Sequence, residues 1–265
     1  MSRYLLISSP LYYSPFHVLS DPHLATFNFF MYHYVIFIWV SEMEMNQNDI
    51  VFRSQVTGFM SRPGVDRYIR IYGWLSGSIA LCDNTRTRYF IECALSDHIP
   101  VIKVKEIILQ NYLFCGFPNT IEALIILNRV LHDKKMKDDN FDDHRSTQQI
   151  RQDGLDLCAI IYGKNYAKLI QNMDHLSSDL SQWMIMEGYG KVLSRPILNP
   201  RERELAVIAA LAVLRRERQL ISHIRGALHA GSTKNEIIEV CSGLSLITDP
   251  TTVEAALKTV DATLN

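Results

Sequence analysis

The feature of this chain that most limits its fold is a similarity between its two halves at one constant offset. When the sequence is shifted by 133 residues, SRPGVDRYIR (61–70) aligns with SRPILNPRER (194–203). Without a gap, FIECALSDHI (90–99) then aligns with HIRGALHAGS (223–232). One offset held over such a span is typical of two related structural units. We place these helical units at about 46–131 and 185–265.

The second unit carries the start signals of a helix near its beginning. Asn199 can cap a helix, Pro200 suits the first helical position, and Glu202 stands three residues after the cap. The following LAVIAALAVL (205–214) is apolar on every side, which predicts a central, buried helix. The charged run RRER (215–218) is expected to turn the chain after it.

Three further helices are predicted after this turn. The first carries apolar residues at helical spacing, namely Leu220, Ile224, Ala227 and Leu228. Gly231 can end it in a left-handed conformation, and Thr233 with Glu236 forms a capping box for the next helix. Pro250 marks the break before the last helix. Because strand-like alternation is scarce, the fold class is predicted to be all-α.

The rest of the chain divides by composition. Residues 132–154 are charged and nearly free of apolar side chains, which favours a solvated linker. Residues 155–173 have apolar positions at helical spacing and are expected to pack on the second unit, which then spans 155–265. Residues 1–45 form an uncertain N-terminal extension. It is either an additional packed segment or not part of the working protein, which would then start at Met43 or Met45.

Composition and charge narrow the classes of function. The net charge is −1, so no basic field favours nucleic acid or acidic membranes. The apolar stretch at 27–40 has 14 residues, whereas a membrane-spanning helix needs about 20. The five cysteines form no C-x-x-C pair, which argues against a disulfide framework or a zinc site. A reducing, cytoplasmic setting is therefore expected.

A histidine and a glutamate in the second unit are candidates for acid–base chemistry. His223 lies on or beside the apolar face of its helix, and Glu204 lies near the start of the preceding helix. Since a short turn joins the two helices, they should run antiparallel and bring both groups together. A histidine oriented by a carboxylate is a common arrangement for proton transfer.

Purely structural interpretations of these residues remain open at this point. Glu204 can complement the helix dipole, and His223 can be a core histidine with one hydrogen bond. In the first unit the equivalent positions are Ile71 and Phe90, so any chemistry is expected in the second unit. Arg195, in the second SRP segment, either binds a substrate carboxylate or bonds helix carbonyls.

The stretch EGYGKVLSRPILNPRERELAVIAALAVLRRERQLISHIRGALHAGSTKNEIIEV (187–240) resembles the carboxymuconolactone decarboxylase family. EIILQNYLFCGFPNTIEAL (106–124) is similar to the later part of the same domain. The resemblance implies tandem all-helical units related to alkylhydroperoxidase D, and a homo-oligomer, here a trimer of two-unit chains. It also implies a small-molecule substrate, with no partnership with nucleic acid or membrane.

The resemblance implies two chemistries for this superfamily. The peroxidase-like branch uses a C-x-x-C pair, whose cysteine positions fall on Arg216 and Gln219 here, so that reading lacks its nucleophile. The decarboxylase branch lacks these cysteines and removes CO₂ from a carboxylated unsaturated lactone without cofactor or metal. It implies Glu204 and His223 as catalytic residues and Arg195 as the substrate-binding residue. A non-catalytic helical oligomer that binds a small molecule is the remaining alternative.

Overall fold

The computed structural model describes residues 47–264 of the chain, and these form helices and connecting segments with no strand among them. The predicted all-α class is thus confirmed. The chain divides into two compact units, Met1–Ser54 and Gln55–Asn265. Residues 47–60 are helical, and everything that follows concerns the second compact unit. The predicted extension at 1–45, with its alternative starts Met43 and Met45, lies outside the described residues.

The helices of the two predicted units begin at positions that differ by 133 residues. In the first unit they are α2 (Arg67–Ala80), α3 (Asn84–Ser96), α4 (Val101–Gln110) and α5 (Tyr112–Asp133). In the second they are α9 (Pro200–Val213), α10 (Glu217–His229), α11 (Lys234–Ser242) and, after the 3₁₀ turn η3 (Gly243–Leu246), α12 (Pro250–Leu264). The turns correspond as well, because Cys82 and Arg215 both adopt positive φ, as do His98 and Gly231.

The predicted caps of the second unit are present. Asn199 and Glu202 form a capping box at the start of α9, with Pro200 as its first residue. Thr233 and Glu236 form the capping box of α11. Gly231 has φ +90° after α10, which is the left-handed conformation expected of a glycine that ends a helix.

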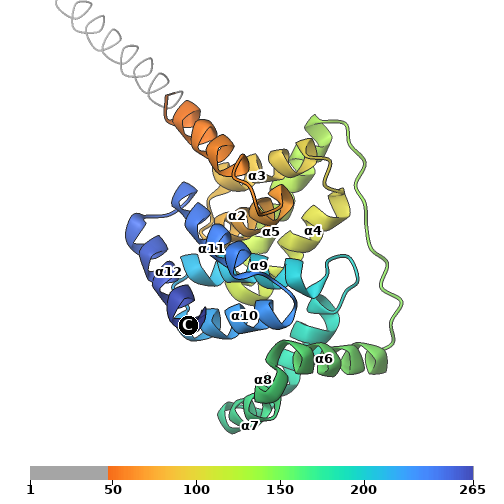
Figure 1. Cartoon of the computed structure of the whole chain (residues 1–265). Coiled ribbons are helices and arrows are strands. Elements are labelled where there is room, and N and C mark those ends of the chain that lie inside the picture. Colours follow the sequence, from red (N-terminus) through yellow and green to blue (C-terminus); the bar gives the residue numbers. More distant parts are fainter. Residues whose placement is uncertain (1–46, 265) are drawn as a thin grey trace, which may run out of the picture. The chain divides into compact units, whose positions relative to one another are not determined.

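Helices α2 and α9 pack against each other at the centre of this unit (Figure 1). Both are buried along almost their whole length, from Ile69 in α2 and from Glu202 in α9. Close packing requires a small residue in η3, because a Cβ on Gly243 would fall 2.2 Å from Nε1 of Trp74. The equivalent helices of the two units therefore share one core rather than forming separate domains.

A set of intervening helices connects the two units. It comprises α6 (Thr147–Tyr162), the 3₁₀ turn η1 (Gly163–Asn165), α7 (Tyr166–Leu176), α8 (Ser178–Trp183) and the π-helix η2 (Met184–Leu193). Helix α6 packs on η2 and on α10. The single packed helix expected at 155–173 is interrupted at Gly163, whose φ is +51°, and the following α7 buries no residue.

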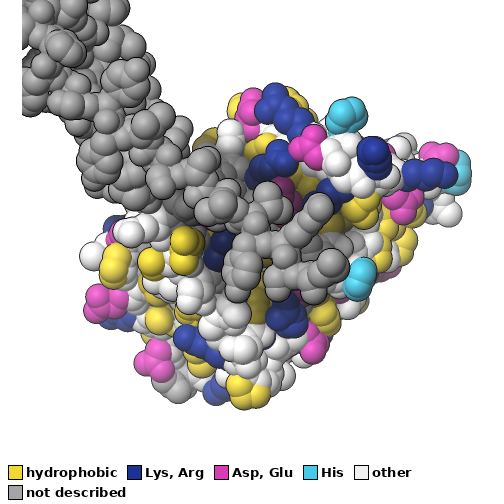
Figure 2. Space-filling model, turned by 90° about the horizontal axis from the view of Figure 1, so that it is seen from above, with side chains coloured by type: hydrophobic (Ala, Val, Ile, Leu, Met, Phe, Trp, Pro, Cys, Tyr) yellow, Lys and Arg dark blue, Asp and Glu magenta, His cyan; other side chains and the backbone are white. Residues whose placement is uncertain are grey.

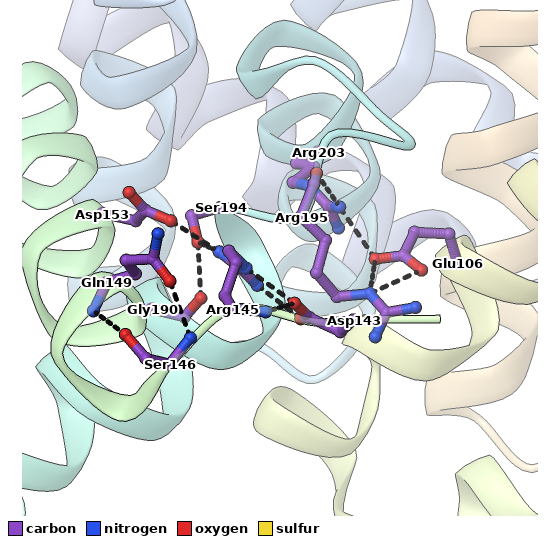
Figure 3. Close-up of polar contacts among 10 residues, drawn as sticks. All are labelled: Glu106, Asp143, Arg145, Ser146, Gln149, Asp153, Gly190, Ser194, Arg195 and Arg203. Carbon is purple, nitrogen blue, oxygen red and sulfur yellow. Dashed lines mark hydrogen bonds and ion pairs between the residues drawn. The ribbon is translucent and has the colours of Figure 1, made fainter. Parts of the chain in front are cut away.

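The linker between the units is shorter than residues 132–154. Helix α5 continues to Asp133, and α6 already begins at Thr147 because Ser146 and Gln149 form a capping box. The non-helical segment between them is also tied to the fold. Arg145 donates hydrogen bonds to Asp143, to Asp153 and to Ser194 Oγ (Figure 3).

Charged side chains of both signs are distributed over the described surface. On the face drawn in Figure 2, lysines and arginines lie among aspartates and glutamates. Such mixing agrees with the small net charge of −1 and gives that face no single-sign field.

Candidate active site

The structure brings Glu204 and His223 into direct contact. Glu204 lies in α9 and is 2% exposed, and His223 lies in α10 and is 7% exposed. The distance from His223 Nδ1 to Glu204 Oε2 is 2.8 Å. The turn between the two helices is short, since α9 ends at Val213 and α10 starts at Glu217. The antiparallel hairpin therefore produces the predicted approach of the two groups.

This contact sets the roles of the two histidine nitrogens. When Glu204 is ionised it is an acceptor only, so Nδ1 carries the proton of the hydrogen bond. Among residues 47–264, Nε2 has no hydrogen-bond partner. A histidine whose Nδ1 is held by a carboxylate presents Nε2 for proton exchange with a ligand. The Glu204–His223 pair thus has the arrangement of a general acid–base group.

The surroundings of the pair are apolar and closely packed. The ring of Phe114, at the start of α5, meets the His223 ring edge-on, with centroids 5.5 Å apart. On the other side, Gly226 allows Glu204 and Ile161 to approach α10. Phe114 and Gly226 were not predicted as site residues. Gly226 follows His223 by three residues, on the same helix face, and that spacing was the signal available in the sequence.

We expect Gly226→Ala to disturb the Glu204–His223 pair. A Cβ at this position would lie 2.7 Å from Ile161 Cγ2 and 2.8 Å from Glu204 Oε2. Overpacking of this kind costs about 1–3 kcal/mol of unfolding free energy, which outweighs the alanine helix preference of about 0.5–1 kcal/mol. Urea unfolding measures the change. Gly58→Ala is the control, since no atom lies within 4 Å of its Cβ, and it should not destabilise the protein.

A buried cysteine and two tyrosines lie near the pair. Burial, followed by the charge of Glu204, raises the pKa of the Cys158 thiol to about 12. Burial likewise raises the pKa of Tyr162 to about 12, and it raises the pKa of the fully enclosed Tyr189 well above its usual value. All three groups therefore stay protonated near neutral pH. Cys158 does not supply the thiolate that a peroxidase needs.

We expect the cysteines to differ sharply in their reaction with a thiol reagent. Cys82 is exposed and should be alkylated in the native protein. Cys158 and Cys241 are buried, and burial raises the pKa of each thiol to about 12, so both should react only after unfolding. Mass spectrometry of alkylated peptides measures this. Rapid native labelling of Cys158 would contradict the enclosed site.

Arg195 does not join Glu204 and His223. Its Nε donates to both carboxylate oxygens of Glu106, at 3.0 and 3.1 Å (Figure 3). Arg203 Nη2 donates to the same carboxylate at 2.8 Å, and also to the carbonyl oxygen of Arg195. Among the described residues, no hydrogen bond or ion pair links Arg195 to the Glu204–His223 pair. The prediction that all three converge is therefore wrong for Arg195, because the first unit supplies its partner.

The same arrangement recurs with the two units exchanged. Arg70 Nε donates to Glu239 Oε1 at 3.0 Å, and Arg70 Nη2 donates to the carbonyl oxygen of Arg62. Arg62 also reaches Glu239, at 3.4 Å. Each unit thus contributes two arginines to a glutamate of the other unit. Glu106 and Glu239, which the sequence reasoning did not single out, are 133 residues apart, like the units themselves.

The first unit has no counterpart of the Glu204–His223 pair. The equivalent residues are Ile71 in α2 and Phe90 in α3, and both side chains are completely buried. They fill the corresponding space with apolar atoms. Ionisable chemistry of this kind is thus confined to the second unit.

The described residues contain no group of three or more His, Cys, Asp and Glu side chains placed to hold a metal ion. Among the same residues, no helix combines the length and the apolar character that crossing a bilayer requires.

The fold and site define a class of protein: a helical protein with a buried glutamate–histidine pair held between two antiparallel helices. Residues 180–262 match the carboxymuconolactone decarboxylase family. A 4-carboxymuconolactone decarboxylase of Acinetobacter baylyi is 30% identical over 100 residues, which is 37% of this chain and 75% of that protein. The chain belongs to the carboxymuconolactone decarboxylase family.

Two yeast proteins are also similar to this chain. The Peroxisomal protein 2 of Schizosaccharomyces pombe is 37% identical over 78 residues, covering 29% of this chain and 37% of that protein. The Peroxisomal protein 2 of Saccharomyces cerevisiae is 27% identical over 170 residues, covering 55% of this chain and 60% of that protein. The matches thus span less than two thirds of either yeast protein.

Proposed function

We propose that this protein is a cofactor-free lyase that removes CO₂ from a small carboxylated lactone or a related acid. The observation that carries the proposal is the 2.8 Å contact between His223 Nδ1 and Glu204 Oε2 in an almost closed site. The name of the bacterial relative, 4-carboxymuconolactone decarboxylase, supplies the substrate class.

In the proposed reaction His223 acts in its protonated form, which the Glu204 carboxylate stabilises. The bond between the carboxylate and the substrate carbon breaks, and CO₂ leaves. The electron pair moves into the conjugated lactone carbonyl, so no cofactor is needed to accept it. The Nε2–H of His223 then gives its proton to the substrate carbon, and solvent returns a proton to the histidine.

Arg195 is no longer part of the proposed substrate contacts, because its Nε is occupied by Glu106. It lines a groove of about 390 Å³ between α5 and η2 that contains neither Glu204 nor His223. Burying the reacting group near Phe114 would instead leave the departing carboxylate with few stabilising contacts. Such destabilisation of the charged ground state relative to the transition state favours decarboxylation.

The direct test measures CO₂ release from 4-carboxymuconolactone by the full chain without added cofactor. One proton is taken up for each CO₂ released in this scheme, so an indicator of pH gives a second measurement. Turnover with this stoichiometry supports the proposal. Absence of turnover with this lactone and with related carboxylated lactones would contradict it.

A second candidate is a non-catalytic helical oligomer that binds a small molecule. Two observations favour it. The groove at Arg195 does not include the Glu204–His223 pair, and α7 and α8 carry exposed apolar side chains, namely Leu176, Leu180 and Trp183. Such side chains commonly contact a partner. Saturable binding of a lactone without CO₂ release would identify this function.

The cellular compartment is a separate question. The cysteine pattern predicts the cytoplasm, whereas two relatives are named Peroxisomal protein 2. Fluorescence microscopy of the tagged full chain beside a peroxisomal marker distinguishes the two compartments.

A further inference from the structure

A second cavity of about 230 Å³ lies between α10 and the η1–α7 segment. Six of its lining side chains are basic or polar: Asn165, Lys168, Asn172, Ser222, Arg225 and His229. On α7 and η1 the spacing is three and four residues, as it is on α10, so each helix directs one polar face to the cavity. The cavity is therefore built from two matched helix faces.

The charges in this cavity are uncompensated. Its lining contains no aspartate or glutamate. Within residues 47–264, neither Lys168 nor Arg225 has an ion-pair or hydrogen-bond partner for its side chain. The chain as a whole has a net charge of −1, so this local surplus of positive charge does not follow from composition. A hollow lined by one sign of charge attracts the opposite ion.

The histidine of this cavity is held in a fixed orientation. His229 Nδ1 contacts the carbonyl oxygen of Ile161 at 2.7 Å, so Nδ1 carries the proton and Nε2 remains for a ligand or solvent. Ile161, Tyr162 and Leu169 add apolar surface to the lining. The cavity thus combines cations and amides with a small apolar wall, a composition typical of ligand sites.

This cavity is separate from the Glu204–His223 pair. Ile161 packs against Gly226 of α10, and Glu204 lies next to the same glycine. The cavity lining includes Ile161 but neither Glu204 nor His223. Its function is therefore independent of the proposed decarboxylation.

We propose that the cavity between α7 and α10 binds a small molecule that carries a carboxylate or phosphate group. The planar guanidinium of Arg225 matches both groups, and Lys168 adds a point charge. The volume of about 230 Å³ is below the usual 300–1,000 Å³ of drug-sized sites, so the ligand is small. Asn165, Asn172 and Ser222 supply further hydrogen-bonding groups.

Isothermal titration calorimetry of the full chain tests this proposal with succinate, inorganic phosphate and, as a neutral analogue of succinate, succinamide. We expect saturable millimolar or tighter binding of at least one anion, weakening as salt is added. Comparison of succinate with phosphate shows which group the site prefers. Succinamide should bind at least about tenfold more weakly than succinate, since hydrogen bonds to charged groups are worth about 1.5–3 kcal/mol.

Variants assign the binding to this cavity. Arg225→Gln and Lys168→Gln should each weaken anion binding about tenfold, whereas Lys168→Arg should retain most of it. Arg216→Gln removes the same charge at an exposed position of the chain outside the cavity lining and should leave binding unchanged. Circular dichroism shows whether each variant is folded.

The proposal is overturned if the wild-type chain binds neither anion, or if the folded Arg225→Gln and Lys168→Gln variants bind as tightly as the wild type. Because calorimetry measures binding, these outcomes are distinct from a failure of CO₂ release.

Discussion

We expect His223→Gln and Glu204→Gln each to lower the rate of CO₂ release from a carboxylated lactone by about 10²–10⁴-fold. Glutamine at position 223 retains polarity but cannot donate a proton as an imidazolium does. Glutamine at position 204 retains the shape of the side chain but removes the negative charge that stabilises that imidazolium. Steady-state measurement of kcat and KM checks the effect, which should appear mainly in kcat.

Matched substitutions separate chemistry from general damage. His175→Gln changes an exposed histidine of α7, and Glu217→Gln changes an exposed glutamate at the start of α10. Both controls should retain turnover within about twofold, a change of less than about 1 kcal/mol. If His223→Gln also keeps full turnover while folded, the histidine is not the proton donor, and the Glu204–His223 pair is structural.

We expect Glu106→Ala to lower the free energy of unfolding by about 3–5 kcal/mol. Glu106 is fully buried and accepts hydrogen bonds from Arg195 and from Arg203, which is itself 1% exposed. Removing the carboxylate leaves the Arg203 charge buried without its partner. Urea-induced unfolding measures the loss, and an unchanged midpoint would show that the ion pair does not stabilise the interface between the two units.

Two comparisons refine this result. The equivalent glutamate, Glu239, has a side chain that is 13% exposed, so solvent can compensate part of the loss in Glu239→Ala. That variant should be less destabilised than Glu106→Ala. The double variant Glu106→Leu with Arg203→Met should recover much of the stability, because replacing a buried ion pair by apolar residues of similar volume is often neutral. Equal losses at positions 106 and 239 would contradict the role assigned to burial.

Part of the candidate site could be predicted from the sequence because its members lie on consecutive helices. Glu204 and His223 are 19 positions apart, on two helices joined by a short turn. Helical spacing and the length of that turn place them at similar depth in the hairpin. Their contact therefore needs no information about the rest of the molecule.

The partner of Arg195 could not be predicted in this way. Glu106 lies 89 positions away in the other unit, and the ion pair exists only because α4 is brought next to the segment before α9. Gly226 shows the same dependence, because its role is decided by Ile161 on α6 and by Glu204 on α9. The length of the linker was likewise decided by the Ser146–Gln149 cap and by the contacts of Arg145.

The sequence by itself determined the all-α class, the duplication at a fixed offset and the helix starts at Pro200 and Lys234, since caps and hydrophobic periodicity act over a few residues. The tertiary structure decided which charges are paired across the two units and which remain available to a ligand. Pairing between distant residues depends on the packing of whole helices, and no local pattern in the chain specifies it. For that reason Arg195 is tied to Glu106, while Arg225 is left facing a cavity.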